Sequence, residues 1–272
     1  MPSPPATKFV DLDGVTVHYL HTGRTTLPDA PPAFERRRPF VLLHAAGSNA
    51  GMWRRQLDGL GATHDAVALD QPGHGRSPGV EGPGSIEHMA ELVRRFRRAL
   101  GPCKPILVGR SMGGAVALVT AAREPEAIAG LVLVCTAARF DGLAGAIAIS
   151  RDVSRGRLPQ QFTTETFSPS TGLDLMKEAW MEQVKTDPRV RLGDLLACQA
   201  FDGVPLLGRV RVPTLVVGGA DDQVTPPERS RELAAGIAGA RLEILPQAGH
   251  QAPLEQHERF AGLLVEFAEG IG

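Results

Sequence analysis

A serine flanked by glycines is the residue of this sequence with the clearest potential for chemistry. Residues 107–116 read LVGRSMGGAV, so Ser111 occupies the pattern G-x-S-x-G. The motif follows a short apolar run (105–109) and opens a run of small and apolar residues that predicts a helix. A sharp strand-to-helix turn needs small residues beside the serine, and it presents the hydroxyl at the carboxyl edge of a sheet. Ser111 is therefore the candidate nucleophile.

A serine hydroxyl needs a neighbouring base before it becomes a good nucleophile. His250 lies in a glycine-containing loop a few residues after the last apolar run (241–246), which places it at the same sheet edge. His44 and His74 precede tight glycine turns, and a structural hydrogen-bonding role suits them better. The other histidines lie in surface-type patterns and are expected to be solvated: His18, His21, His64, His88 and His257.

A histidine base needs a carboxylate that holds its tautomer and stabilises the imidazolium. The segment VVGGADDQVTPP offers Asp221 and Asp222, just past the penultimate apolar run (213–219). The residues by themselves leave the choice between the two open. Either aspartate gives the chain order serine, aspartate, histidine.

Two backbone N–H groups are candidates for stabilising an oxyanion. The N–H of Met112 lies at the start of the predicted helix, where the helix dipole favours negative charge. The second donor is expected from the loop LLHAAGSNAGMW, where Ala46 follows His44 by two residues. Small residues there let the backbone approach the substrate oxygen.

These residues require a scaffold of buried strands joined by helices. Two short runs flank Asp13-Gly14, which predicts a hairpin. Apolar strands are then expected at 40–47, 65–70, 105–109, 130–137, 213–219 and 241–246. A helix is expected at 86–100 with Ser85 as its N-cap. Continuous apolar strands alternating with helices indicate an α/β fold, with a parallel sheet covered by helices on both faces.

Residues 141–209 interrupt this alternation, because they contain no convincing strand and read as several helices. They are interpreted as a helical insertion, and therefore as a lid over the sheet. Binding sites are mostly apolar, so apolar lid residues are expected to line or roof a pocket. The candidates are Leu143, Ile147, Phe162, Phe167, Leu175, Met176, Trp180 and Leu196. The sequence leaves open which of them face the pocket.

Composition excludes several classes of function. The chain has 272 residues and a formal net charge of −1 at pH 7, so neither nucleic acid nor an anionic membrane is expected as a partner. The basic cluster at 94–98 fits a solvated helix face. The cysteines Cys103, Cys135 and Cys198 are far apart, which predicts reduced thiols in a cytoplasmic protein. No motif predicts a metal or a cofactor, and no apolar run predicts a signal or a membrane span.

Five segments in order carry a family resemblance: LLHAAG, LDQPGHGRS, LVGRSMGG, VVGGADDQVTP and QAGHQAPLEQ. The sequence resembles serine hydrolases of the α/β-hydrolase fold over residues 8–140 and 210–270. The resemblance implies a mostly parallel eight-stranded sheet, with a core of residues 1–140 and 210–272. It places the lid, 141–209, between the sixth and seventh strands.

The resemblance also selects the acid. In the family pattern G-x-x-D-x-x-x-P, Gly219 and Pro226 frame Asp222, and Asp221 becomes a solvated neighbour. Asp141 is the fallback, because some relatives place the acid after the sixth strand. The triad implied is then Ser111, Asp222 and His250.

The resemblance implies hydrolysis of carboxylic esters or lactones through an acyl-serine, without cofactor. This chain has His44-Ala45 where many relatives have His-Gly. In that respect HAAGS…GMWRRQ is similar to enol-lactone hydrolases and some bacterial lactonases and esterases. The substrate is therefore expected to be a small to medium ester or lactone, with acyl-homoserine lactones among the candidates.

Several alternatives stay open at this stage. The same triad serves cofactor-free perhydrolysis and carbon–carbon bond hydrolysis, and a catalytically silent ligand receptor is the non-enzyme alternative. The chain is expected to be a monomer or a homodimer. Arg110, directly before the serine, is expected to bind neighbouring loops rather than substrate.

Overall fold

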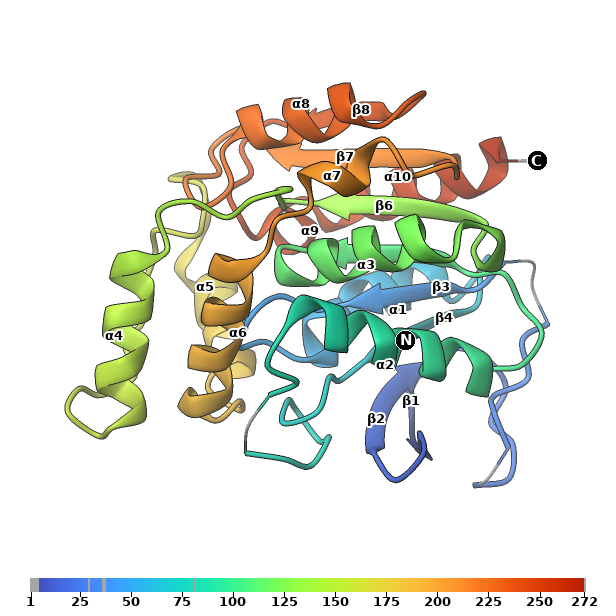
Figure 1. Cartoon of the computed structure of the whole chain (residues 1–272), viewed down its shortest axis with the longest axis horizontal. Helices are drawn as coiled ribbons and strands as arrows, with labels where there is room; N and C mark the ends of the chain where they lie inside the picture. The colour runs from blue at the N-terminus through green and yellow to red at the C-terminus, as the bar shows by residue number, and fades with distance from the viewer. Residues whose placement is uncertain (1–4, 29, 36–37, 81, 272) are drawn as a thin grey trace.

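One eight-stranded sheet forms the centre of the molecule (Figure 1). The computed structural model describes residues 5–28, 30–35, 38–80 and 82–271. The sheet order is β1-β2-β4-β3-β5-β6-β7-β8. β2 pairs antiparallel with β1 and β4, and the other neighbours pair in parallel. The predicted mostly parallel eight-stranded α/β sheet is confirmed.

The strands fall where apolar runs predict them, with ends that differ by a few residues. Their bounds are β1 Ala6–Asp11, β2 Thr16–His21, β3 Phe40–Leu43, β4 Ala66–Leu69, β5 Ile106–Arg110, β6 Gly130–Val134, β7 Thr214–Gly219 and β8 Arg241–Leu245. Every residue of β3 to β7 is buried. Strands buried on both faces read as continuous apolar runs, which is why the sequence revealed them.

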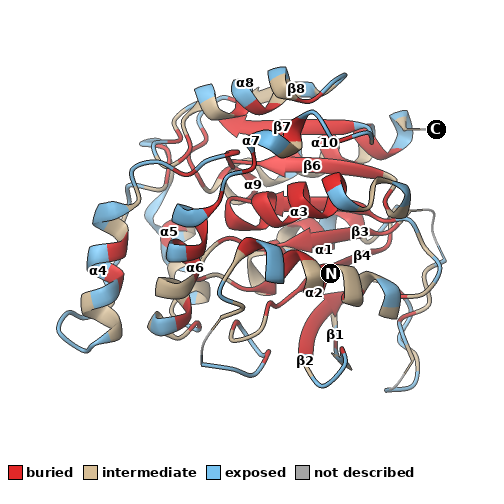
Figure 2. Ribbon diagram, in the orientation of Figure 1, coloured by how far each residue is buried: buried red, intermediate tan, exposed pale blue. Residues whose placement is uncertain are grey.

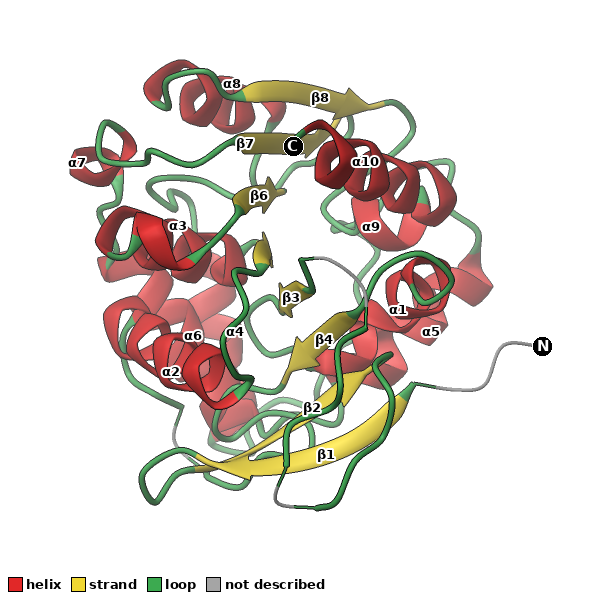
Figure 3. Ribbon diagram, turned by 90° about the vertical axis from the view of Figure 1, so that its right-hand side faces the viewer, coloured by secondary structure: helices red, strands yellow, loops and turns green. Residues whose placement is uncertain are grey.

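Helices cover both faces of this sheet (Figure 3). Alternate residues of a strand point to opposite faces. Val41 and Leu43 therefore pack in one cluster with α2 (Ile86–Ala99), α3 (Met112–Arg123) and α8 (Pro227–Gly236). Phe40 and Leu42 pack in a second cluster with α1 (Arg54–Leu60) and α10 (His257–Gly270). In α2 the predicted N-cap is confirmed, because Ser85 Oγ accepts a hydrogen bond from the His88 N–H at 3.2 Å.

Four helices lie between β6 and β7: α4 (Ala144–Ser154), α5 (Leu173–Gln183), α6 (Pro188–Ala200) and α7 (Val204–Leu207). Residues 141–209 contain no strand, as expected. In Figure 1 α4, α5 and α6 stand beside the carboxyl ends of the parallel strands. Figure 2 shows that these helices mix buried and exposed residues, whereas the central strands are buried throughout. The division into a core and a lid stays a prediction.

Two histidines differ from expectation. His18 and His21 in β2 are buried rather than solvated, with exposed fractions of 3% and 0%. The reason is that β2 lies inside the sheet, between β1 and β4, instead of forming a free hairpin edge. His18 Nδ1 lies 2.6 Å from Asp70 Oδ2, so it belongs to a buried polar network.

Candidate active site

Ser111 lies at the tip of a strained turn between β5 and α3. Its φ of 53° and ψ of −120° are unusual for a residue with a side chain. A Cβ at Gly109 would overlap the backbone of Gly113, and a Cβ at Gly113 would overlap the Leu43 carbonyl. Both glycines of the G-x-S-x-G pattern are therefore required by close backbone approach, and the turn holds the hydroxyl clear of the sheet.

Ser111, His250 and Asp222 form one hydrogen-bonded chain. His250 Nε2 lies 3.0 Å from Ser111 Oγ, and His250 Nδ1 lies 2.9 Å from Asp222 Oδ2. Because Asp222 accepts the proton on Nδ1, Nε2 is left to accept the Ser111 hydroxyl proton. The residues are 8%, 5% and 3% exposed, respectively. The structure brings together the three residues that the sequence pointed to as a triad.

Asp222 remains a carboxylate in this buried position. Burial raises its pKa, but the electrostatic interaction with the His250 ring and hydrogen bonds from His250 and Thr225 outweigh burial and hold the pKa below its usual value. Asp222 Oδ1 accepts the N–H groups of Val224 (2.8 Å) and Thr225 (2.9 Å), and Oδ2 accepts the Thr225 hydroxyl (2.9 Å). These bonds fix the carboxylate toward the imidazole.

His250 is held neutral, as a base must be. Burial lowers its pKa below 6.5, the charge of Asp222 offsets this in part, and the charge of Arg110 lowers it further. Its loop is fixed by Glu255, whose Oε2 accepts the Gly249 N–H at 2.8 Å. Arg110 Nε also donates to the His250 carbonyl at 2.8 Å.

The alternative acids lie elsewhere. Asp221 Oδ2 accepts the Ser168 hydroxyl at 2.6 Å. Asp141 is exposed and pairs with Arg229 at 2.6 Å. The spacing between Gly219 and Asp222 explains the selection, since a Cβ at Gly219 would overlap the Ala248 and Gly249 carbonyls of the histidine loop. The end of β7 therefore lies against the loop that carries His250, and this contact places Asp222 beside His250.

The two candidate oxyanion donors come from different loops. Met112 opens α3, so its N–H has no intrahelical partner, and Ala46 lies on the cavity wall in the loop after β3. Neither N–H donates a hydrogen bond to another residue in the part of the chain that the structure describes. Both therefore remain available to an oxygen atom bound at Ser111.

The Ala46 loop is fixed by a buried polar cluster. His44 Nδ1 donates to the Ala45 carbonyl (2.9 Å) and Nε2 accepts the Gln71 N–H (3.1 Å). Burial lowers the pKa of His44 to about 4, so it stays neutral in this arrangement. His74 Nε2 and the Gly47 N–H both bind Asp194 Oδ2, at 2.7 and 2.8 Å. His44 and His74 have the structural role that was predicted for them.

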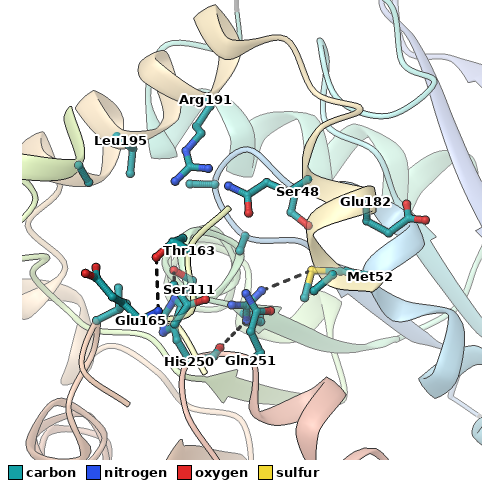
Figure 4. A pocket seen from close by; sticks show the side chains of 18 of the residues that line it. Ser48, Met52, Ser111, Thr163, Glu165, Glu182, Arg191, Leu195, His250 and Gln251 are labelled. Atoms are coloured by element: carbon teal, nitrogen blue, oxygen red, sulfur yellow. Dashed lines mark hydrogen bonds between the residues drawn. The ribbon is translucent and has the colours of Figure 1, made fainter. Parts of the chain in front are cut away.

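A cavity of about 700 Å³ opens onto Ser111 and His250. This volume is typical of sites for small organic ligands. Figure 4 shows Thr163 above the serine and Met52 and Ser48 at one side. The segments that line it include the loop after β3, α4, the connection 160–166, α5 and α6.

Two of the apolar residues expected at a pocket lie on the wall of this cavity. Phe162 and Leu143 line the cavity. Six others do not: Ile147, Phe167, Leu175, Met176, Trp180 and Leu196. Phe167, Met176 and Trp180 therefore lie outside the lining of this cavity. Phe167 and Met176 are buried by packing inside the protein, and Trp180 packs edge-on behind Phe162 with 6.1 Å between ring centroids.

Sequence reasoning missed four contributors. Thr225 supports the acid, and its position three residues after Asp222 is the spacing of a local side-chain-to-backbone turn, a signal that could have found it. Asp194, Glu255 and Arg191 reach the site from α6 and α9 (Ala252–Glu255), and nothing in their local sequence marks them.

Within residues 5–28, 30–35, 38–80 and 82–271, no helix combines the length and the apolar character that crossing a bilayer demands. The same ranges hold no group of His, Cys, Asp and Glu side chains arranged as a metal site. The cysteines Cys103, Cys135 and Cys198 are free thiols.

Known proteins resemble this chain in sequence, and a solved structure resembles it in fold. The chain is 29% identical to a pimeloyl-acyl-carrier-protein methyl ester esterase of Neisseria meningitidis, covering 91% of this chain and 98% of that protein. It is 27% identical to a 2-hydroxy-6-oxo-6-phenylhexa-2,4-dienoate hydrolase of Comamonas testosteroni, covering 94% and 92%. The structure of an enol-lactonase from Burkholderia xenovorans superposes with a TM-score of 0.80 at 27% identity, covering 96% and 99%.

These relatives are all hydrolases, which supports a hydrolase activity for this chain. Residues 38–256 match the family model described as the alpha/beta hydrolase fold. That match spans the candidate nucleophile, the acid, the base and the helical segment between β6 and β7. The chain therefore belongs to the alpha/beta hydrolase fold family.

Proposed function

We propose that this protein hydrolyses carboxylic esters or lactones of small to medium size through an acyl-serine intermediate. The observation that carries the proposal is the hydrogen-bonded chain from Asp222 through His250 to Ser111, which ends at a cavity of about 700 Å³. These contacts support the roles of nucleophile for Ser111, base for His250 and acid for Asp222 in acyl transfer.

The first half of the reaction transfers the acyl group to the protein. Ser111 Oγ attacks the carbonyl carbon while His250 Nε2 takes the hydroxyl proton, and Asp222 stabilises the imidazolium that forms. The N–H groups of Ala46 and Met112 bind the oxyanion. His250 then gives its proton to the leaving alkoxide, and the tetrahedral intermediate collapses to the acyl-serine.

The second half restores the enzyme. Water enters the cavity, and His250 takes a proton from it as it attacks the acyl carbonyl. Collapse of the second tetrahedral intermediate returns that proton to Ser111 Oγ and releases the carboxylic acid. In a lactone the alcohol stays attached to the acyl group, so a single hydroxy acid leaves.

The test combines turnover with active-site labelling. The wild-type protein is expected to hydrolyse p-nitrophenyl butyrate and simple lactones, and a fluorophosphonate is expected to label Ser111. Ser111→Ala should lose labelling and lower kcat by about three or more orders of magnitude, with an unchanged melting temperature. A labelled peptide other than that of Ser111, or retention of most activity in the variant, would contradict the mechanism.

The same preparation separates the neighbouring activities. Turnover of a vinylogous 1,5-diketone without ester turnover would identify carbon–carbon bond hydrolysis. Peroxyacid formation from acetate and hydrogen peroxide without ester turnover would identify perhydrolysis. Absence of turnover and of labelling together would favour a ligand receptor.

A further inference from the structure

Among the arginines that line the cavity of Ser111, Arg110 and Arg191 are withdrawn from solvent, whereas Arg54 is exposed and Arg55 pairs with Glu178. Arg110 is 3% exposed, its Nε donates to the His250 carbonyl, and its Nη1 lies 4.0 Å from Met52 Sδ. Arg191 on α6 is half-buried, and its stem lies against Gly47. Among the described residues, neither guanidinium has a carboxylate oxygen within 4.0 Å. In Figure 4 the Arg191 side chain extends from its helix toward Ser111.

The pKa values of Arg110 and Arg191 agree with the absence of a carboxylate partner in the described part of the chain. Burial lowers the pKa of both arginines, and nearby carboxylates offset that effect only in part. The carboxylates that act on Arg110 are already engaged: Asp222 holds His250, and Glu255 accepts from Gly249, Ser168 and Thr171. Asp194, which acts on Arg191, is bound to Gly47 and His74.

The acidic residues of the cavity do not neutralise these arginines. Glu178 pairs with Arg55 at 2.7 Å, and Glu182 pairs with Lys185 at 2.6 Å. Glu165 is exposed. Figure 4 shows the carboxylates of Glu165 and Glu182 directed away from Ser111. The guanidinium groups of Arg110 and Arg191 therefore line the cavity without a carboxylate counter-ion among the described residues.

From this arrangement we infer a substrate class: the protein prefers an ester or lactone that carries a free carboxylate, which the guanidinium groups of Arg110 and Arg191 bind while Ser111 attacks the ester carbonyl. The inference rests on the proposed function and deepens it. A buried cation without a partner is costly, and a substrate carboxylate would remove that cost on binding. The planar guanidinium matches the planar carboxylate through paired N–H donors.

Half esters and diesters of one dicarboxylic acid form the matched substrate pair. Monomethyl and dimethyl adipate have the same chain, and they differ in one free carboxylate. Methanol release gives kcat/KM for each, and the measured quantity is the ratio of half ester to diester. Monomethyl esters from succinate to suberate then scan the distance between carboxylate and ester.

The wild-type ratio is expected to exceed one at the best chain length. Arg191→Gln should lower this ratio by about 10–100-fold, mainly through KM, because hydrogen bonds to charged groups are the strong ones. Arg110→Gln should also lower it. Arg189→Gln is the matched control, since Arg189 lies on the same helix, is exposed and pairs with Asp187 at 2.7 Å outside the cavity. It should leave the ratio unchanged.

Binding without turnover gives an independent readout. Calorimetry with monomethyl adipate on Ser111→Ala should show binding that the added Arg191→Gln substitution weakens by about the same factor. The inference is overturned if the wild-type protein hydrolyses the diester at least as well as every half ester and the arginine substitutions leave the ratio unchanged. Ester hydrolysis that depends on Ser111 would then still stand. Absence of turnover of every ester and of fluorophosphonate labelling would overturn the proposed function together with it.

Discussion

Asp194 ties α6 to the loop that carries the Ala46 N–H, so its removal is expected to destabilise the fold measurably. The side chain is fully buried. Its Oδ2 accepts hydrogen bonds from the Gly47 N–H at 2.8 Å and from His74 Nε2 at 2.7 Å. Both ring nitrogens of His74 face oxygen atoms, because Nδ1 lies 3.1 Å from the Pro72 carbonyl. The arrangement suits a doubly protonated imidazolium.

The size of the effect follows from the two donors that Asp194 satisfies. Asp194→Ala leaves both buried and unpaired, at about 1–3 kcal/mol each. Removing one partner of a buried ion pair costs about 3–5 kcal/mol, which agrees with that sum. At about 2–4 °C per kcal/mol in a protein of this size, the melting temperature should fall by about 6–20 °C. Asp194→Asn keeps a neutral acceptor, so a loss of about 1–3 kcal/mol is expected.

The pH dependence gives a second signature. Burial lowers the pKa of His74, but Asp194, the Pro72 carbonyl and Asp70 outweigh it and raise the pKa above 6.5. The neighbouring His44 is neutral and adds no charge. A histidine whose pKa is raised on folding contributes stability that is complete below about pH 6.5 and is lost as the pH rises through the raised value. The loss of unfolding free energy that Asp194→Asn causes, relative to the wild-type protein, should therefore be larger at about pH 6 than at about pH 9.

The assay is thermal denaturation followed by circular dichroism at both pH values. Asp174→Asn is the matched control, since Asp174 lies in the same helical segment with a fully exposed side chain. It should leave the melting temperature within the error of the measurement. A melting temperature of Asp194→Ala equal to that of the control would refute the reasoning. If the stability that Asp194→Asn loses were the same at both pH values, the charged state of His74 would be refuted.

The remaining predictions concern the triad and its turn. Because the pKa of His250 is lowered, kcat/KM for a neutral ester should decline on the acid side with a midpoint below pH 6.5. Arg110→Gln should move that limb to higher pH, because Arg110 lowers this pKa; an unmoved limb would count against the coupling. Asp222→Asn should lower kcat by about 10⁴-fold, and Asp221→Asn only a few-fold. Gly113→Ala should give little folded protein by circular dichroism, since its Cβ would overlap backbone.

The residues of the triad could be found from the sequence because each is tied to a local signal. Gly109 and Gly113 surround Ser111 because the turn leaves no room for side chains. The strands are apolar throughout because both faces of the sheet are covered. In a parallel sheet, residues that follow strands meet at one edge, so Ser111, Asp222 and His250 converge there.

Only the tertiary structure decided which side chains of the helical segment face the cavity. Phe162, Phe167 and Trp180 are equally apolar in sequence, but only Phe162 lines the cavity, because contacts with the surrounding fold rather than composition set the direction of each ring. Arg191 and Asp194 are one helical turn apart in α6. One lines the cavity, and the other is buried against His74.

The sequence by itself determined the sheet, the order of the triad and the turn that carries the nucleophile, because these depend on short segments with strict steric demands. The tertiary structure decided the shape and charge of the cavity, because these depend on contacts between residues distant in the chain. Arg110 illustrates both contributions, that of the sequence and that of the tertiary structure. The sequence placed it beside Ser111, and the fold bonded it to the His250 carbonyl and left it on the cavity wall without a carboxylate partner among the described residues.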